Sequence, residues 1–129
     1  MPGQTADPTR ADQDYCYVTT TGRVTGNPHT IEIWFAMNDS TIYILAGGRY
    51  RSDWVRNAKK APRVGVRIAG HTFEGVARIV EDGTEDALAR RMLLDKYAKS
   101  ADSGLDDWGR TALAVAIDLT PQADATTAG

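Results

Sequence analysis

The sequence has one cysteine and two histidines, and this scarcity excludes several classes of protein. A single cysteine, Cys16, cannot form a disulfide within the chain, which fits a reducing, cytoplasmic location. Its strand-like surroundings favour a packed thiol over a reactive one. His29 and His71 lie far apart, and no CxxC, HxxxH or carboxylate cluster appears, so we expect no metal site. No Ser-His-Asp or Cys-His arrangement indicates a protein nucleophile either.

Long apolar runs and a surplus of positive charge are also missing. No stretch approaches the roughly 20 apolar residues that a membrane-spanning helix needs, and the polar first residues do not resemble a signal peptide. The chain has 129 residues, of which 42% are hydrophobic, and a net charge of −2. These values fit one domain with a core and disfavour nucleic acid as a partner. Seven basic residues against one acid occupy positions 49–67, which suits a small anionic ligand.

Alternating apolar and polar residues predict a mainly β protein. We expect strands at residues 15–20, 30–36, 41–45, 63–68, 71–80 and 111–119. Ser52 is the expected N-cap of a helix over 54–60, and Thr84 that of a helix reaching about residue 99. Short connections indicate an antiparallel sheet that curls into a barrel of about six strands, with two or so helices. The domain would span residues 14–120, between a flexible arm (1–13) and a flexible tail (121–129), with a lid-like loop at 100–110.

One predicted strand carries aromatic residues on both of its faces. Ile31, Ile33 and Phe35 fall on one side, whereas Trp34 falls on the other. We therefore expect Trp34 to meet a second hydrophobic surface or a dimer interface. An interface at Trp34 would make the protein a homodimer.

Two glycine-containing turns hold most of the functional information. The first is residues 19–29 (TTTGRVTGNPH), and the second is residues 46–54 (AGGRYRSDW). Each turn follows an apolar, β-branched run and combines glycine, hydroxyl groups and arginine. Backbone N–H groups, hydroxyls and a guanidinium are the groups that bind phosphate. We interpret the two turns as two walls of one anion-binding site, although Arg23 and Arg51 could also be solvated surface residues.

Together the turns and their surroundings resemble a known family. The sequences TTTGRxTGxP, SDW and NAKKAPRV, in this order over residues 18–80, are similar to the deazaflavin-dependent nitroreductase group of the split β-barrel flavin and deazaflavin oxidoreductases. The last predicted strand is compatible with it. The resemblance implies an FMN-binding-type split barrel, paired in a homodimer as in similar proteins, and a cytosolic enzyme. It also implies hydride transfer from reduced coenzyme F420 to a small acceptor, such as a quinone-like, enone or nitroaromatic compound, with no protein nucleophile.

The resemblance also implies which residues bind the cofactor. The first turn would meet its phosphate and acidic tail, and the second turn and the following helix would run along it; the matching residues are Thr21, Gly22, Arg23, Thr25, Gly26, Ala46, Gly47, Gly48, Arg51, Ser52, Trp54 and Asn57. The nitroreductase branch has basic residues where this chain has Val24 and His29. Arg49 and Arg51 could compensate, or the cofactor could be the smaller FMN. Ser52 and the amides at Gly47 and Gly48 are the candidates for a contact to the ring.

Other interpretations stay open at this stage. Trp54 suits the core better than a cofactor platform, and Tyr97 and Trp108 are candidates for the acceptor pocket. A non-catalytic carrier of a flavin, haem or fatty acid would need the same phosphate contacts and no nucleophile. A small barrel that binds single-stranded nucleic acid is disfavoured by the net acidity.

Overall fold

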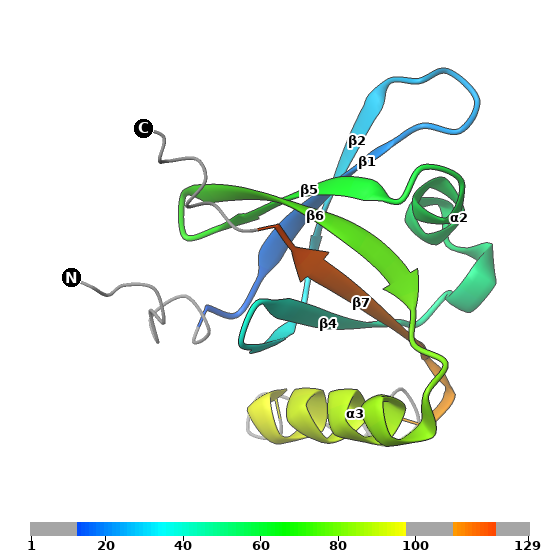
Figure 1. The fold of residues 1–129 in the computed structure, drawn as a ribbon. Helices are drawn as coiled ribbons and strands as arrows, with labels where there is room; N and C mark the ends of the chain where they lie inside the picture. Colours follow the sequence, from blue (N-terminus) through cyan, green and yellow to red (C-terminus); the bar gives the residue numbers. More distant parts are fainter. Residues whose placement is uncertain (1–12, 98–109, 121–129) are drawn as a thin grey trace.

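The computed structural model describes residues 13–97 and 110–120, and within them it is mainly β (Figure 1). Several predicted features lie outside the described residues. These are the expected tail, the expected arm apart from Gln13, and nearly all of the lid-like loop, which includes Trp108. The elements are β1 (Cys16–Thr21), β2 (Pro28–Ile33), β3 (Ala36–Asn38), β4 (Thr41–Ala46), η2 (Arg49–Arg51), α2 (Asp53–Lys60), β5 (Arg63–Ile68), β6 (His71–Ile79), α3 (Gly83–Tyr97) and β7 (Leu113–Leu119). None of the helices in the described part is long and apolar enough to cross a membrane.

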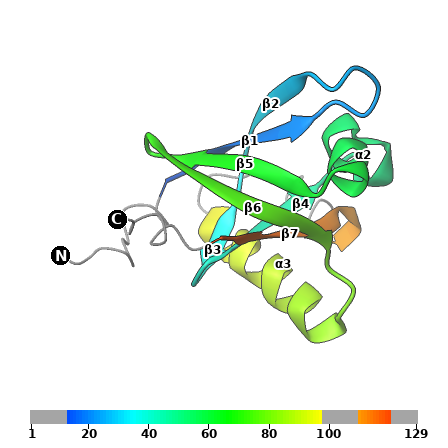
Figure 2. The same cartoon turned by 45° about the horizontal axis from the view of Figure 1, so that its top comes forward.

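The seven strands form one antiparallel sheet that curls into a split barrel. Their order is β2-β1-β5-β6-β7-β4-β3, so β2 and β3 are the two edges. Only Trp34 and Phe35 separate β2 from β3 in the chain. The sheet therefore has to curl until its two edges meet at these residues, as the views in Figures 1 and 2 show. The barrel expected from the sequence is confirmed.

The predicted strand at 30–36 is two strands, because the chain bends at Trp34–Phe35. Here the backbone is bound by side chains of α3 instead of a neighbouring strand. The Phe35 N–H donates to the Tyr97 hydroxyl (3.0 Å), which itself donates to the Phe35 carbonyl (2.9 Å). Lys96 Nζ also donates to this carbonyl (2.8 Å). Side-chain contacts of this range have no local signal in the sequence, so the break was not predictable.

Alternate residues of the strands fill the barrel. Val64, Val66 and Ile68 of β5 are buried, opposite the outward-facing Arg63 and Arg67, as their alternation predicts. They pack in one cluster, which also contains Cys16, Val18, Phe35, Ile42, Ile44, Ala58, Ala77 and Ile117. Cys16 is fully buried, and this burial raises the pKa of its thiol to about 12. The interpretation as a packed thiol is confirmed.

The helix α3 forms a second layer against the outer face of β3, β4 and β7 (Figure 1). Ala114 and Ala116 of β7 meet Ala89, Leu93 and Tyr97 of the helix. Because this face of β7 is covered as well as the inner one, the strand is buried on both sides. Trp34 stacks on Tyr97 with ring centroids 4.1 Å apart. The second hydrophobic surface expected for Trp34 therefore lies within the chain.

The cap of α3 differs from expectation, whereas the cap position of α2 is confirmed. Asp82, not Thr84, caps α3: its Oδ2 accepts a hydrogen bond from the Glu85 N–H (2.9 Å). A carboxylate at this position satisfies a free N–H of the first turn. Ser52 is the N-cap residue of α2, but its hydroxyl makes no capping bond. Its oxygen instead lies where the Cβ of a larger residue at position 48 would be, so Gly48 leaves room for this side-chain conformation of Ser52.

Candidate cofactor-binding site

The turn between β1 and β2 has the glycines that its shape requires. Gly26 has a φ of +81°, a conformation that L-residues rarely adopt. A Cβ on Gly22 would lie 2.7 Å from Nε2 of His29. The Gly22 N–H donates to Asn27 (2.8 Å), and the Gly26 N–H donates to Gly22 (2.9 Å). These two amides thus close the turn, so they are not the free donors that the phosphate interpretation assumed.

Asn57 joins this turn to the helix α2. Only 4% of Asn57 is exposed. Its Oδ1 accepts from the Arg23 backbone N–H (3.1 Å) and from Nη1 of Arg23 (2.8 Å). Its Nδ2 donates to Oγ1 of Thr20 (3.2 Å), which is also buried. Buried polar groups that are satisfied in this way hold their elements in a fixed position.

Arg23 is held by α2 on its other side as well. Nη2 of Arg23 lies 3.2 Å from Oδ1 of Asp53, and Lys60 Nζ donates to the Arg23 carbonyl (3.2 Å). The Arg23 side chain is 29% exposed, whereas that of Asp53 is 83% exposed. Arg23 is thus neither a solvated turn residue nor a fully available anion-binding group. It is a half-buried guanidinium with one firm partner and one exposed partner.

A hollow of about 470 Å³ lies between this turn, β2 and α2. Its polar groups come mainly from the turn and α2, and its apolar surface from Ile31 and Trp54. The residues around it are Gly22, Arg23, Val24, Thr25, His29, Thr30, Ile31, Asp53, Trp54 and Asn57. Trp54 is half-buried and packs against the barrel core, as expected, and it also lines the hollow. We call this hollow the turn–helix site.

The structure brings together only some of the residues expected in the site. Five of them line the hollow, namely Gly22, Arg23, Thr25, Trp54 and Asn57. Thr21 and Gly26 are exposed next to it in the same turn. Ile31, Thr30 and Asp53 line the hollow although the sequence did not indicate them as site residues. Val24 and His29 also line it, at positions where the family's nitroreductase branch has basic residues. The alternation of apolar residues along β2 was the one feature of the sequence that could have indicated Ile31 as a lining residue.

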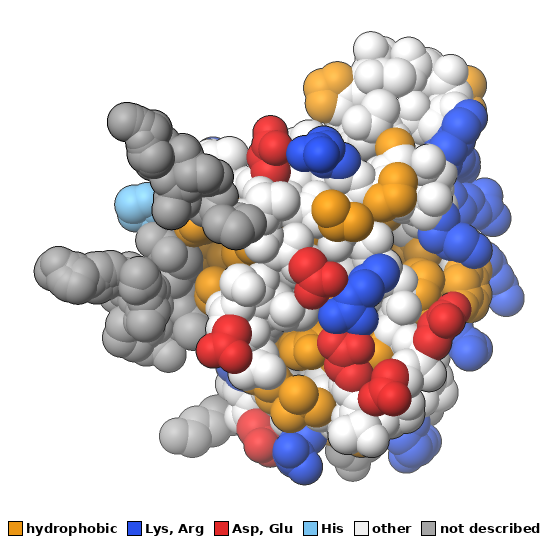
Figure 3. Space-filling view, in the orientation of Figure 1, with side chains coloured by type: hydrophobic (Ala, Val, Ile, Leu, Met, Phe, Trp, Pro, Cys, Tyr) orange, Lys and Arg blue, Asp and Glu red, His pale blue; other side chains and the backbone are white. Residues whose placement is uncertain are grey.

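The part of the second glycine-containing turn that precedes α2 does not line the turn–helix site, whereas its last two residues, Asp53 and Trp54, do. Ala46 is buried, whereas Gly47, Gly48, Arg49 and Arg51 are exposed on the loop and on η2 that lead to α2. Arg49 has a φ of +57°. Figure 3 shows Lys and Arg side chains gathered on this side of the molecule, over α2; exposed basic residues here are Arg49, Arg51, Arg56, Lys59 and Lys60. A locally basic region is therefore present, next to the hollow.

Tyr97 lies in the core, away from the turn–helix site. It is 2% exposed, stacks on Trp34, and donates its hydroxyl to the carbonyls of Phe35 and Asp14. Burial raises the pKa of this hydroxyl to about 12. These contacts give Tyr97 a structural role, and we do not retain it as an acceptor-pocket residue. Within the described residues, no group of three or more His, Cys, Asp or Glu side chains is placed to hold a metal ion.

A second arginine network lies on the outer sheet surface, where α3 begins. Arg78 binds both oxygens of Glu85 (2.7 Å each) and Oδ2 of Asp118 (2.7 Å). Tyr43 donates its hydroxyl to Glu85 (2.7 Å), and Thr41 donates to Asp118 (3.0 Å). Hydrogen bonds from Arg78 and Tyr43 lower the pKa of Glu85 to about 2, and Arg78 also lowers the pKa of Asp118. This network fixes α3 to β4, β6 and β7.

Comparison with known families identifies the class to which the chain belongs. Residues 4–118 match the F420H(2)-dependent quinone reductase family, which is most of the chain. The chain is therefore a member of this family. The enzyme class, a reductase, and the cofactor, coenzyme F420, follow from that membership. A search among curated proteins found no match.

Solved structures with low sequence identity share the fold. A protein from Bacteroides thetaiotaomicron that is assigned to 5-nitroimidazole antibiotic resistance has a TM-score of 0.71 at 18% identity. The match covers 94% of this chain and 82% of that one. An F420-H2 dependent reductase (FDR-A) has a TM-score of 0.67 at 17% identity, covering 81% and 94%. The haem-storage protein HutZ from Vibrio cholerae has a TM-score of 0.70 at 15% identity, covering 92% of both chains. These similarities show a fold that serves several functions.

Proposed function

We propose that the protein reduces a quinone-like, enone or nitroaromatic compound with reduced coenzyme F420, and that the cofactor binds along the turn–helix site. One observation supports this assignment above the others. A hollow with both an aromatic wall and a half-buried arginine lies where the family resemblance puts the cofactor. Ligand sites of this kind combine apolar walls with a few polar groups that fix orientation.

The residues present fit the chemistry of F420. Its flat ring system suits an apolar wall such as that of Trp54 and Ile31. Its phosphate and acidic tail suit the basic residues at and beside the hollow, namely Arg23, Lys60, Arg49 and Arg51. The exposed carboxylate of Asp53 is the group that such an anion would displace from Arg23.

In this proposal the protein binds and orients, and the bound cofactor supplies the hydride. Asn57 keeps Arg23 at the mouth of the hollow, because it binds both the backbone and the side chain of that residue. Trp54 and Ile31 exclude water from the hollow. Thr21, Thr25, Gly26, Gly47, Gly48 and Ser52 border the same region, and we keep them as proposed cofactor contacts. The acceptor takes its proton from solvent or from a nearby hydroxyl.

A binding and turnover experiment tests the function. Purified protein is titrated with oxidised F420 and, in parallel, with FMN, and binding is followed by ligand fluorescence. The reduced cofactor is then mixed with menadione, cyclohexenone or a nitroaromatic compound, and its reoxidation is followed by absorbance. Micromolar F420 binding, weaker FMN binding and acceptor-dependent reoxidation are the expected results. Binding without turnover of any acceptor would favour the carrier, and failure to bind F420 would remove the proposal.

We also propose a cytoplasmic homodimer. The aromatic argument from Trp34 no longer supports a dimer, because that ring stacks on Tyr97 within the chain. The remaining support is the resemblance to proteins with paired barrels and the edge strand β2, whose first residues, Pro28 to Thr30, are exposed. Exposed edges are common sites of association. Size-exclusion chromatography with light scattering at micromolar concentration should give twice the monomer mass, and a monomer mass would reject the dimer.

A further inference from the structure

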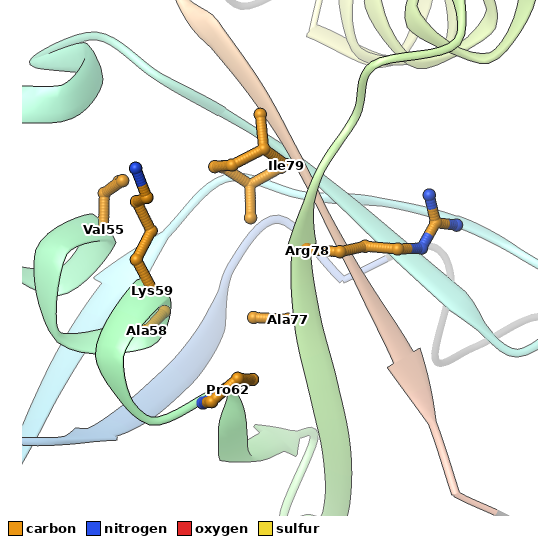
Figure 4. Close-up of a pocket in the computed structure, with 8 residues that line it drawn as sticks. Val55, Ala58, Lys59, Pro62, Ala77, Arg78 and Ile79 are labelled. Atoms are coloured by element: carbon orange, nitrogen blue, oxygen red, sulfur yellow. The ribbon is translucent and has the colours of Figure 1, made fainter.

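A second pocket lies on the other side of α2 from the turn–helix site. It has a volume of about 200 Å³ and lies between the helix and strands β6 and β7 (Figure 4). The two hollows share no lining residue: Trp54 and Asn57 face the first, and Val55, Ala58 and Lys59 face the second. The cofactor proposal therefore does not account for this second pocket, which we call the α2–β6 pocket.

Most of the lining of the α2–β6 pocket is apolar. Its apolar residues are Val55, Ala58, Pro62, Ala77, Ile79 and Val115. A cavity of about 150 Å³ with such walls can bind benzene. The pocket is thus large enough for one six-membered ring with a small substituent, and too small for a cofactor of several rings.

The charged side chains that line the pocket are both positive. Two lining residues are charged, Lys59 and Arg78, and no carboxylate lines the pocket. Arg78 is bound to Glu85 and Asp118, and in Figure 4 its guanidinium points away from the other lining residues. Lys59 is exposed, and its ammonium lies 4.9 Å from the ring centroid of Tyr50. Lys59 is therefore the positive group available to a ligand.

We infer that the α2–β6 pocket binds a small aromatic carboxylate, with its ring against the apolar walls and its anion beside Lys59. The ring follows from the apolar lining and the volume. The carboxylate follows from a single ammonium with no acid in the lining. This site needs no cofactor, so its test does not depend on the proposed reductase activity.

Titration with three probes at pH 7 tests the site, using ¹⁵N-labelled full-length protein and two-dimensional NMR. Benzoate has the ring and the charge, benzamide has the ring alone, and acetate has the charge alone. Benzoate should bind most tightly and shift the amide signals of Val55, Ala58 and Ile79. Shifts that do not saturate, or that fall mainly on residues away from this pocket, would overturn the proposal.

The variant Lys59→Met tests the charge, because Lys59 is exposed and the barrel does not depend on it. Benzoate affinity should fall about fivefold, the equivalent of about 1 kcal/mol for a partly exposed ion pair, while benzamide affinity stays unchanged. Arg91→Met, an equal change of charge at an exposed position on α3, should leave both affinities unchanged. Equal benzoate binding by the wild type and Lys59→Met would overturn the assignment of the carboxylate.

Discussion

The two arginine networks of this protein differ in how firmly their guanidinium groups are held. Arg78 binds two carboxylates, with three of its hydrogen bonds at 2.7 Å. Arg23 binds a neutral amide oxygen at 2.8 Å and one carboxylate, Asp53, at 3.2 Å. The carboxylates also differ in exposure, since the side chains of Glu85 and Asp118 are 22% and 47% exposed and that of Asp53 is 83% exposed.

This difference distinguishes a structural arginine from a binding one. Short, bidentate, charge-assisted hydrogen bonds hold Arg78 in one geometry. The exposed pair between Arg23 and Asp53 contributes little to stability, so an anionic ligand can replace the carboxylate at low cost. Asn57 meanwhile keeps Arg23 in position. We therefore expect Arg78 to affect mainly stability and Arg23 mainly cofactor affinity.

The largest expected effect on stability is that of Arg78→Met. The substitution leaves Glu85 and Asp118 without their guanidinium partner. Charge-assisted hydrogen bonds contribute about 1.5–3 kcal/mol each, and the exposure of this site reduces that value. The free energy of unfolding, measured by urea denaturation, should fall by about 2 kcal/mol with F420 affinity unchanged. A stable variant that loses cofactor binding would reverse the roles of the two arginines.

Acid should remove part of the same stabilisation. The pKa of Glu85 is about 2 in the folded protein against an ordinary 4.5, and that of Asp118 is also lowered. Groups with lowered pKa values stabilise the fold above their ordinary pKa, and this contribution is lost as the pH falls through the folded value. The free energy of unfolding should thus decrease between pH 4.5 and 2, less steeply in Glu85→Gln. Asp95→Asn, at an exposed carboxylate of α3, should follow the wild-type curve. Parallel curves for Glu85→Gln and the wild type would contradict this explanation.

A smaller loss of stability is expected for Asn57→Ala. The variant removes the acceptor of Arg23 and the partner of the buried Thr20 hydroxyl, and an unsatisfied buried group costs about 1–3 kcal/mol. Because Arg23 can turn to solvent, we expect a loss of about 1 kcal/mol in urea denaturation, with F420 affinity reduced as well. If Asn57 acts through Arg23, the double variant Asn57→Ala/Arg23→Ala should bind F420 no more weakly than Arg23→Ala alone. A further loss of affinity in the double variant would mean that Asn57 does not act through Arg23.

Much of the fold was predictable from the sequence because strand alternation is a local signal. The expected range of β5 matches the structure, and the mainly β barrel with two principal helices is confirmed. The break at Trp34–Phe35 was missed because it depends on Tyr97 and Lys96, about 60 residues away. Thr84 is the cap that the sequence predicts, and Asp82 is the actual cap. Both residue types are good caps, and the position of the cap depends on where the chain leaves β6.

Less of the candidate site was predictable. The sequence indicated Arg23, Asn57 and Trp54 correctly as neighbours of one hollow, because a family motif carries them. It did not indicate that the amides of Gly22 and Gly26 close their own turn. It also predicted the second turn as a second wall of the same site, whereas only Asp53 and Trp54 of that turn line the hollow. Sequence order does not fix how far a loop extends past a helix N-terminus. Whether that turn contacts the cofactor stays a prediction.

The most direct test of the cofactor assignment is the F420 affinity of Arg23→Ala compared with Arg91→Met. Both variants remove one positive charge, and only Arg23 lies at the turn–helix site. Fluorescence titration should show about tenfold weaker F420 binding in Arg23→Ala, a difference of about 1.4 kcal/mol, and wild-type binding in Arg91→Met. Equal F420 affinity in Arg23→Ala and the wild type would show that the cofactor does not bind at this arginine.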